Sequence, residues 1–205
     1  MIAIVDYGMG NLRSVQKALL CLGAQANIVS HGDELDKADK VVLPGVGAFS
    51  DAIDRLRATG MDQAIASAAK KGKWLFGICL GMQMLFDVSH EDGRHEGLGL
   101  IAGEVVKFSF DALPQPRPRI PHMGWNSLHW ADGGPLMQGI EQGCYAYFAH
   151  SYHVAPSDAG DVCTSTEYGY QFASSIRRGN ILATQFHPEK SQSVGLRMLE
   201  NFIRL

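Results

Sequence analysis

The sequence predicts an α/β fold, built on an open, mostly parallel, twisted sheet with helices on both faces and antiparallel strand additions. Between residues 2 and 78, short apolar runs alternate with amphipathic segments, which is typical of a parallel sheet covered on both sides. The second half instead contains strand-like runs separated by Gly, Pro, Asn and Asp turns, which favours antiparallel pairing. The 205 residues show no repeat or low-complexity tract, so we expect a single domain over residues 1–205.

The first half supplies the parallel strands and their helices. Four apolar runs are predicted strands, at residues 2–5, 24–29, 41–43 and 74–78. Three segments are predicted helices, namely residues 11–22, a helix that Ser50 can cap, and residues 61–71. Because ligands gather at the carboxyl ends of parallel strands, we expect the functional site at that edge of the sheet.

The second half supplies the remaining strands and a closing helix. Five further strand-like runs lie at residues 105–108, 145–148, 162–166, 172–176 and 181–186. Four prolines within residues 114–121 indicate an extended loop, since the apolar segments on either side belong to no separate core. The chain ends in a predicted helix from Ser191 to Leu205, with Ser191 as its N-terminal cap.

The composition argues against several classes of protein. The net charge is -3 and the charges are dispersed, so there is no basic stripe that would bind nucleic acid. The longest apolar stretch, residues 74–86, is interrupted by glycines and is too short to cross a bilayer. Residues 1–6 lack the positive leader of a secretion signal, and the four cysteines show neither zinc-knuckle nor disulfide-framework spacing. We therefore expect a cytoplasmic protein with reduced thiols that binds neither nucleic acid nor a membrane.

Cys79 is the candidate nucleophile. It follows the apolar run 74–76 and has Gly77 two positions before it and Gly81 two positions after it. This pattern is typical of a sharp strand-to-helix turn, in which bulkier neighbours would collide and the central side chain is displayed. The positive end of the following helix would favour the thiolate. The alternative is an ordinary buried cysteine.

His187 and Glu189 form the only His-x-Glu pair of the chain and directly follow a predicted strand. In an extended chain, residues two apart point to the same side, so both side chains can reach one site. The carboxylate would orient the imidazole, and the imidazole would take the thiol proton and later protonate the leaving group. The alternative is a turn with a solvated carboxylate.

Backbone amides near Cys79 are the candidate oxyanion donors. The amide of Leu80 would point toward the same space as the Cys79 thiol. A second donor is expected from the loop at residues 44–47, which follows a strand and contains two glycines that allow close backbone approach. The amide of Val46 or Gly47 is therefore the second candidate.

Neither a cofactor nor a metal is expected. Gly8 and Gly10 follow the first strand as in a dinucleotide-binding loop, but Arg13 stands at the third glycine position. His150 and His153 are three apart, and such positions face opposite sides of a strand. The polar segment at residues 90–96 is interpreted as solvated surface.

Six segments resemble the class I, triad-type glutamine amidotransferases, and together they span nearly the whole chain. They are residues 6–12 (DYGMGNL), 44–49 (PGVGAF), 77–83 (GICLGMQ), 121–126 (PHMGWN), 147–152 (YFAHSY) and 185–191 (QFHPEKS). The cysteine turn and the His-Pro-Glu triplet are shared by many glutaminases. The first, fourth and fifth segments are most similar to the glutaminase subunits of imidazole glycerol phosphate synthases, which act in histidine biosynthesis.

The resemblance implies hydrolysis of L-glutamine to glutamate and ammonia through a cysteine thioester. It assigns roles as follows: catalytic, Cys79, His187 and Glu189; oxyanion site, Leu80 with Val46 or Gly47; glutamine binding, Gln83, Ser151 and Tyr152; partner contacts, Asn11, Trp125, Tyr147 and Lys190. It further implies a heterodimer with a (β/α)8-barrel cyclase that receives the ammonia and makes imidazole glycerol phosphate. Because free ammonia is largely protonated in water, we expect low activity without the cyclase and its ligand.

Other functions stay open at this stage. The triad also fits another amidotransferase, such as the glutaminase of pyridoxal phosphate synthesis, or a peptidase on the same scaffold, although residues 121–126 argue against both. A non-catalytic interaction subunit whose cleft senses a metabolite is a further alternative. An α/β-hydrolase is disfavoured because its acid precedes its histidine, whereas Glu189 follows His187.

Overall fold

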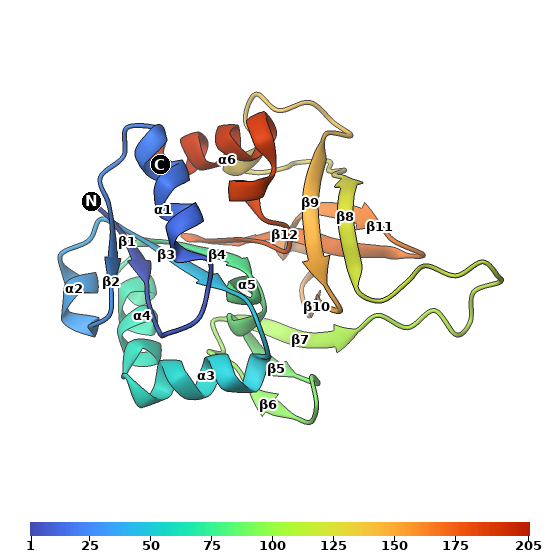
Figure 1. Cartoon of the computed structure of the whole chain (residues 1–205), viewed down its shortest axis with the longest axis horizontal. Coiled ribbons are helices and arrows are strands. Elements are labelled where there is room, and N and C mark those ends of the chain that lie inside the picture. Colours follow the sequence, from blue (N-terminus) through green and yellow to red (C-terminus); the bar gives the residue numbers. More distant parts are fainter.

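A seven-stranded sheet forms the centre of the computed structural model, which describes residues 1–205 (Figure 1). The strand order is β11-β12-β13-β4-β3-β1-β2. The parallel strands are β1 (Ile2–Val5), β2 (Ala26–Val29), β3 (Lys40–Gly45), β4 (Trp74–Cys79) and β13 (Ile181–Thr184). Antiparallel additions at one edge are β12 (Gln171–Arg178) and β11 (Val162–Glu167). The predicted fold class is confirmed.

Helices cover both faces of this sheet. Figure 1 shows α1 (Leu12–Cys21) and α6 (Gln192–Arg204) on one side, with α3 (Phe49–Ala58) and α4 (Met61–Lys70) on the other. The short α2 (Gly32–Asp36) packs against α4, and α5 (Leu80–Met84) follows β4 directly. Strand side chains alternate between the two layers, so that Ile2 and Ile4 belong to one core cluster and Ala3 and Val5 to the other.

The remaining strands form two smaller sheets. The first contains β5 (Phe86–Ser89), β6 (His95–Glu96), β7 (Ile101–Lys107) and β10 (Tyr152–Pro156). The second is a two-stranded ribbon of β8 (His122–Ser127) and β9 (Tyr145–His150). The expected antiparallel additions to the central sheet thus come from β11 and β12, whereas the predicted runs at residues 105–108 and 145–148 correspond to β7 and β9 of the smaller sheets. Each finds its partners in strands that residue patterning left unassigned, because β5, β6, β8 and β10 are short or interrupted.

Of the two predicted helix caps, Ser50 is wrong, and Ser191 has the predicted N-cap position without the capping bond. Ser50 lies inside α3, whose first amide, that of Phe49, donates to the carboxylate of Glu91 at 2.8 Å. Ser191 precedes α6 but makes no capping bond. Its hydroxyl instead donates to the carbonyl of His187 at 2.6 Å and accepts from the amide of Tyr147 at 3.0 Å. A long-range partner thus replaces the local cap at α3, whereas at the start of α6 the Ser191 hydroxyl is engaged in other hydrogen bonds.

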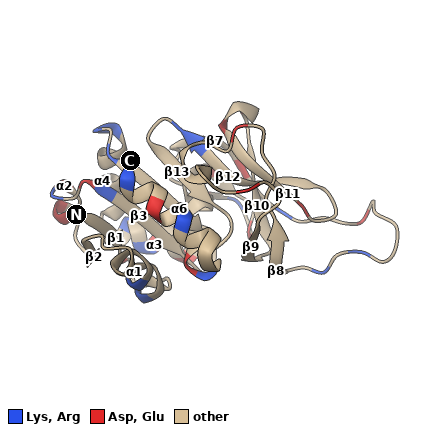
Figure 2. Cartoon of the chain, turned by 90° about the horizontal axis from the view of Figure 1, so that it is seen from above, with Lys and Arg blue, Asp and Glu red and all other residues tan.

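Residues 108–121 connect β7 to β8 as a long loop without regular structure, as expected for the proline-rich segment. Much of this loop projects away from the central sheet, and charged residues are spread along it and over the rest of the surface (Figure 2). Arg117 and Asp111 form an ion pair within it, at 3.5 Å. None of the helices is both long and apolar enough to cross a membrane.

Gly195 sets how closely α6 can approach the segment after β13. A side-chain carbon at this position would lie 1.8 Å from the carbonyl oxygen of Pro188 and 2.7 Å from its carbonyl carbon. Both atoms belong to the backbone, so a change of side-chain rotamer cannot relieve the clash. The short 3-10 turn η3 (Pro188–Lys190) therefore depends on a glycine in the facing helix.

We expect Gly195→Ala to lower the free energy of unfolding by about 2 kcal/mol or more, because the added methyl forces α6 away from Pro188. Chemical denaturation measures this change. The matched control is Ser193→Ala, an exposed position on the same helix, where the substitution should alter stability by less than about 0.5 kcal/mol. Equal effects at the two positions would contradict the packing argument.

Candidate active site

The central position of β4 brings the predicted catalytic segments together. Strand β4 pairs with β3 on one side, where Gly45 is opposite Cys79, and with β13 on the other, where Thr184 is opposite Ile78. All three strands run in parallel, so their carboxyl ends meet at one edge. Cys79 consequently lies between the loop after β3, which contains Val46, and the segment after β13, which contains His187.

Cys79 sits in a strained turn that its glycine neighbours permit. Its φ is 55° and its ψ is -110°, an unusual backbone conformation for a residue with a side chain. A side-chain carbon on Gly77 would lie 2.9 Å from the carbonyl oxygen of Gly81, and one on Gly81 would lie 1.8 Å from that of Leu43. The prediction that bulkier neighbours would collide is therefore confirmed.

The imidazole of His187 lies between a thiol and a carboxylate. His187 Nδ1 is 2.8 Å from Glu189 Oε1, and Cys79 lies near enough to the ring to change its pKa. Burial by itself would lower the pKa of His187, but the hydrogen bonds and negative charges of Cys79 and Glu189 raise this pKa to about 10. The imidazole is thus held in its protonated form beside the sulfur at neutral pH.

The side chains of His187 and Glu189 meet as predicted, but not because the chain is extended over both residues. The chain is extended only at His187 and then enters η3, which contains Glu189. The carboxylate reaches back to the ring over a single tight turn. Both side chains are almost fully buried, at 4% and 1% exposure, so the carboxylate is not the solvated group of the alternative interpretation.

A cavity of about 340 Å³ opens over Cys79. Its lining includes nine of the residues proposed from the sequence: Cys79, His187, Val46, Gly47, Leu80, Gln83, Ser151, Tyr152 and Lys190. The backbone amides of Val46 and Gly47 donate to no acceptor within the chain. The triad candidates, the oxyanion candidates and the glutamine-binding candidates therefore share one site, with Glu189 buried behind His187.

Tyr7 fixes the end of β3, just before the oxyanion candidates Val46 and Gly47. No sequence pattern singled out this tyrosine. The Tyr7 hydroxyl donates to the carbonyl of Pro44 at 3.0 Å and is only 3% exposed as a residue. Burial first, and then the negative charge of Cys79, raise the pKa of Tyr7, so the phenol stays neutral and keeps its proton for this bond.

Three of the four candidate partner contacts lie together. The rings of Trp125 and Tyr147 are 6.0 Å apart, and Lys190 Nζ lies 5.8 Å from the centre of the Tyr147 ring. Lys190 also lines the cavity over Cys79. Asn11 is separate, at the start of α1, and lines a small space next to Glu189.

Several residues at the site were missed or misread. Gln185 is fully buried, and its amide Nε2 lies 3.8 Å from Cys79 Sγ. Glu91 is not simple solvated surface, because its carboxylate accepts from Phe49 and lines the cavity. No signal in the sequence singles out Gln185, since its place one residue beyond the β4–β13 register follows only from the pairing of the two strands.

A histidine network lies beside the cavity. His150 and His153 do not face opposite sides, because the chain passes from β9 to β10 between them and both rings lie near Phe108, at 5.2 and 4.7 Å. His122 Nδ1 is 3.0 Å from His150 Nε2. Burial lowers the pKa of His122 to about 4 and, as the largest cause, that of His150 to about 3. Both imidazoles are neutral at physiological pH.

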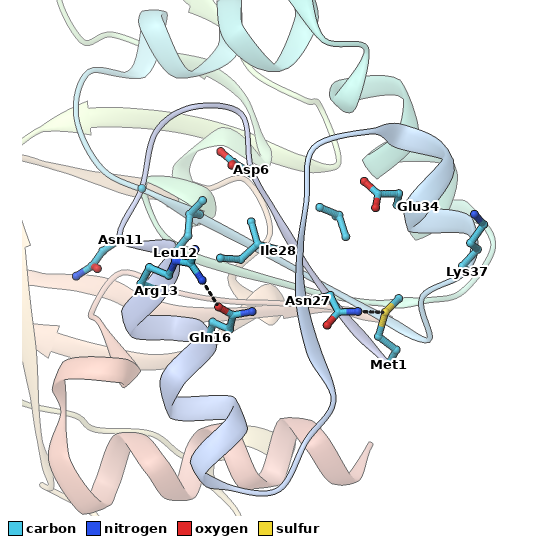
Figure 3. Close-up of a pocket in the computed structure, with 12 residues that line it drawn as sticks. Met1, Asp6, Asn11, Leu12, Arg13, Gln16, Asn27, Ile28, Glu34 and Lys37 are labelled. Carbon is cyan, nitrogen blue, oxygen red and sulfur yellow. Dashed lines mark hydrogen bonds between the residues drawn. The ribbon is translucent and has the colours of Figure 1, made fainter.

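A second and larger cavity, of about 940 Å³, lies at the edge of the sheet next to β2 (Figure 3). Its lining combines both signs of charge, from Asp6, Arg13, Glu34 and Lys37, and contains no nucleophile with a neighbouring base. Figure 3 shows Arg13 bonded to Gln16 within it, at 3.2 Å. Size alone therefore does not locate the chemistry of this molecule.

Comparison with known proteins adds to this geometry. A family model described as glutamine amidotransferase class-I matches residues 3–205. The chain is 48% identical over 203 residues to the imidazole glycerol phosphate synthase subunit HisH of Syntrophotalea carbinolica, and the match covers 98% of each protein. It is 46% identical over 205 residues to the subunit of the same name from Wolinella succinogenes, which covers 100% of both.

Solved structures share the fold at lower identity. The structure of PurLQS from Thermotoga maritima includes a chain that is 22% identical, with a TM-score of 0.76 and coverage of 99% of this chain and 97% of that one. A structure described as a glutamine amidotransferase is 20% identical, with a TM-score of 0.73 and coverage of 99% and 98%.

We expect the free energy of unfolding to fall as the pH decreases from about 6.5 to about 4. An unfolded histidine binds a proton near pH 6.5, whereas folded His122 and His150 stay neutral down to about pH 4 and about pH 3. The unfolded state therefore binds more protons in this range, and each histidine contributes a slope of up to about 1.4 kcal/mol per pH unit. Urea denaturation at a series of pH values measures the slope.

His122→Asn should reduce this slope by the contribution of one proton, whatever its effect on stability at pH 7. The control is Phe148→Leu, since Phe148 stacks on His122 with ring centres 4.6 Å apart and has no titrating group. It should lower stability and leave the slope unchanged. If the free energy of unfolding of His122→Asn depended on pH as steeply as that of the wild type, the lowered pKa of His122 would be refuted.

Proposed function

The chain belongs to the class I glutamine amidotransferase family, and from this membership we propose that it is the glutaminase subunit of an imidazole glycerol phosphate synthase. In this role it hydrolyses L-glutamine to glutamate and ammonia. The ammonia passes to a cyclase subunit that makes imidazole glycerol phosphate in histidine biosynthesis. The observation that best supports the catalytic part is the contact series from Cys79 through His187 to Glu189 at the base of a cavity.

The proposed reaction begins with the thiolate of Cys79 attacking the carboxamide carbon of glutamine. The carbonyl electrons move onto oxygen, where the amides of Leu80 and of Val46 or Gly47 stabilise the negative charge. His187, which is already protonated because its pKa is about 10, gives its proton to the departing nitrogen as the C–N bond breaks. Ammonia leaves and a thioester remains.

Water then completes the turnover. His187, now neutral, takes a proton from the water that attacks the thioester carbon. The C–S bond breaks, its electron pair returns to the sulfur of Cys79, and glutamate leaves. Glu189 keeps the ring oriented through both steps and balances its positive charge, since its Oε1 lies 2.8 Å from Nδ1.

Glutamine binding is proposed for the same cavity. Gln83 and the backbone around Ser151 and Tyr152 line it together with His187. Gln83 is only 5% exposed, so its amide orientation is fixed by protein contacts before the substrate arrives. A preset polar wall of this kind lowers the cost of orienting the substrate for attack.

A barrel cyclase is proposed to cover the ribbon face. Met123, Trp125 and Tyr145 are 66%, 45% and 58% exposed, which is unusual for large apolar side chains. Lys190 lies over the Tyr147 ring of this ribbon, and Asn11 lines a small space with His187 and Glu189. Enclosure by a partner keeps ammonia away from bulk water, where it would be protonated and lose its nucleophilicity.

We expect Cys79→Ala to reduce glutamine hydrolysis by about 10⁴-fold or more, because no other group can form the thioester. The measurement is release of glutamate by the complex with the cyclase. Cys144→Ala, a partly exposed thiol remote from the cavity lining, is the control and should keep wild-type turnover. A glutamine-mimicking electrophile should label Cys79 alone. Retained hydrolysis in Cys79→Ala would refute the nucleophile and favour a non-catalytic subunit.

Activity is expected to depend on the partner. Glutamine hydrolysis should rise by about tenfold or more when a barrel cyclase and its nucleotide ligand are added, which corresponds to a coupling free energy of at least about 1.4 kcal/mol. Imidazole glycerol phosphate should form with glutamine as the only nitrogen source. Equal hydrolysis with and without the cyclase, together with no product, would point to another amidotransferase pathway.

A further inference from the structure

Gln185 lies next to the reactive sulfur although it belongs to no part of the triad. It follows β13, whose register places Thr184 opposite Ile78, so the next pair along the two strands is Gln185 and Cys79. Its side chain is completely buried. Gln185 Nε2 lies 3.8 Å from Cys79 Sγ, within hydrogen-bonding distance for sulfur, and Gln185 Oε1 lies 3.1 Å from Gln83 Nε2.

The orientation of this amide is fixed by a backbone carbonyl. The carbonyl of Tyr152 can only accept, and Gln83 Nε2 donates to it at 3.0 Å. The second hydrogen of the same Gln83 nitrogen points to Gln185, so Gln185 must present its oxygen there. Its NH₂ group is left facing Cys79. Reversal of either amide would bring two oxygens or two NH₂ groups together.

Neutral histidines hold the same carbonyl from behind. His150 Nδ1 lies 2.8 Å from the oxygen of Tyr152 and must donate to it. A neutral His150 then accepts at Nε2 from His122 Nδ1, and His122 accepts at its Nε2 from Asn126, at 3.3 Å. Every donor in the series is therefore determined, from Asn126 in the ribbon to Tyr152 at the cavity wall.

We propose that Gln185 is a catalytic residue of this site, whose amide N–H binds the anionic sulfur of Cys79. This inference rests on the proposed function for its role in turnover. A hydrogen bond to an ion is stronger than one between neutral groups, so the contact favours the thiolate over the thiol. Unlike the imidazole, the amide has no proton to give away.

This difference matters in the second half of the reaction. His187 has by then given its proton to the departing ammonia and takes one from the attacking water. When the C–S bond breaks, the electron pair moves to the sulfur, and the N–H of Gln185 is in place to stabilise it. Gln185 thus assists the formation of the attacking thiolate and its departure from the thioester.

The test measures the sulfur directly. Alkylation of Cys79 by iodoacetamide is followed by mass spectrometry across pH in the full-length protein, with Gln185→Met and Gln185→Glu. Methionine has a similar size and no donor, and glutamate keeps the acceptor for Gln83 while losing the NH₂ group. In both variants the midpoint of the alkylation profile should move up by about one to two pH units, equivalent to a ten- to hundredfold smaller thiolate fraction below the midpoint.

Gln185→Glu also places a new negative charge beside the sulfur, which by itself raises the midpoint, so Gln185→Met isolates the loss of the N–H donor. The other groups near the sulfur are unchanged in both variants. The titratable groups that face it or line its cavity are His187, Glu189 behind it, Tyr7, Glu91, His150, Tyr152 and Lys190. The control is Thr184→Val, which removes a buried hydrogen bond to the carbonyl of Phe186 and does not touch the sulfur. It should keep the wild-type midpoint. A wild-type midpoint in folded Gln185→Met and Gln185→Glu would overturn the proposal.

A wild-type measurement decides the question where the variants fold poorly. The side-chain NH₂ signals of Gln185 in an NMR spectrum should shift with the ionisation of Cys79 and lose that pH dependence in Cys79→Ala. If the chemical shifts of the Gln185 NH₂ group did not change with the ionisation of Cys79, the proposal would be overturned. Failure of the proposed function is distinguishable, because it would abolish glutamine hydrolysis by the wild-type complex while leaving the alkylation profiles and NMR shifts as described here.

Discussion

The parallel register of three strands, β3, β4 and β13, is the constraint on which the site depends. It places Cys79 between the end of β3 and the end of β13, so that groups from distant parts of the chain approach one sulfur from two sides. Backbone hydrogen bonds of the sheet determine this arrangement, and no flexible element intervenes. The side chains at the site then need only short reaches, as the 2.8 Å contact between His187 and Glu189 illustrates.

Close backbone approach is the second requirement, and it explains where glycine is needed. Gly81 allows the turn after Cys79 to pass over Leu43, and Gly195 allows α6 to pass over Pro188. One contact fixes Cys79, and the other fixes the segment that contains His187. The positive φ of Cys79 is tolerated because the surrounding sheet and helices hold the turn in place.

The sequence predicted the parts of the site that depend on local pattern. The Gly-x-Cys-x-Gly turn and the His-x-Glu pair can each be recognised from a few neighbouring residues. The parallel strands are predicted by continuous apolar runs. Ser191 lies at the predicted cap position but makes no capping bond, because the amide of Tyr147, far away in the chain, takes its hydroxyl. Strand β8 was missed because Gly124 interrupts it and its large side chains face outward. Gln185 escaped notice because an amide gains chemical meaning only from its neighbours.

The hydroxyl of Ser191 has a mechanical consequence. The amide of His187 donates to the carbonyl of Tyr147 at 2.9 Å, and the amide of Tyr147 donates to Ser191, whose proton goes back to the carbonyl of His187. Hydrogen bonds thus connect the peptide groups on both sides of His187 to strand β9 of the ribbon. A displacement of the ribbon is therefore transmitted to His187 through three hydrogen bonds. It does not pass through a flexible loop that would absorb it.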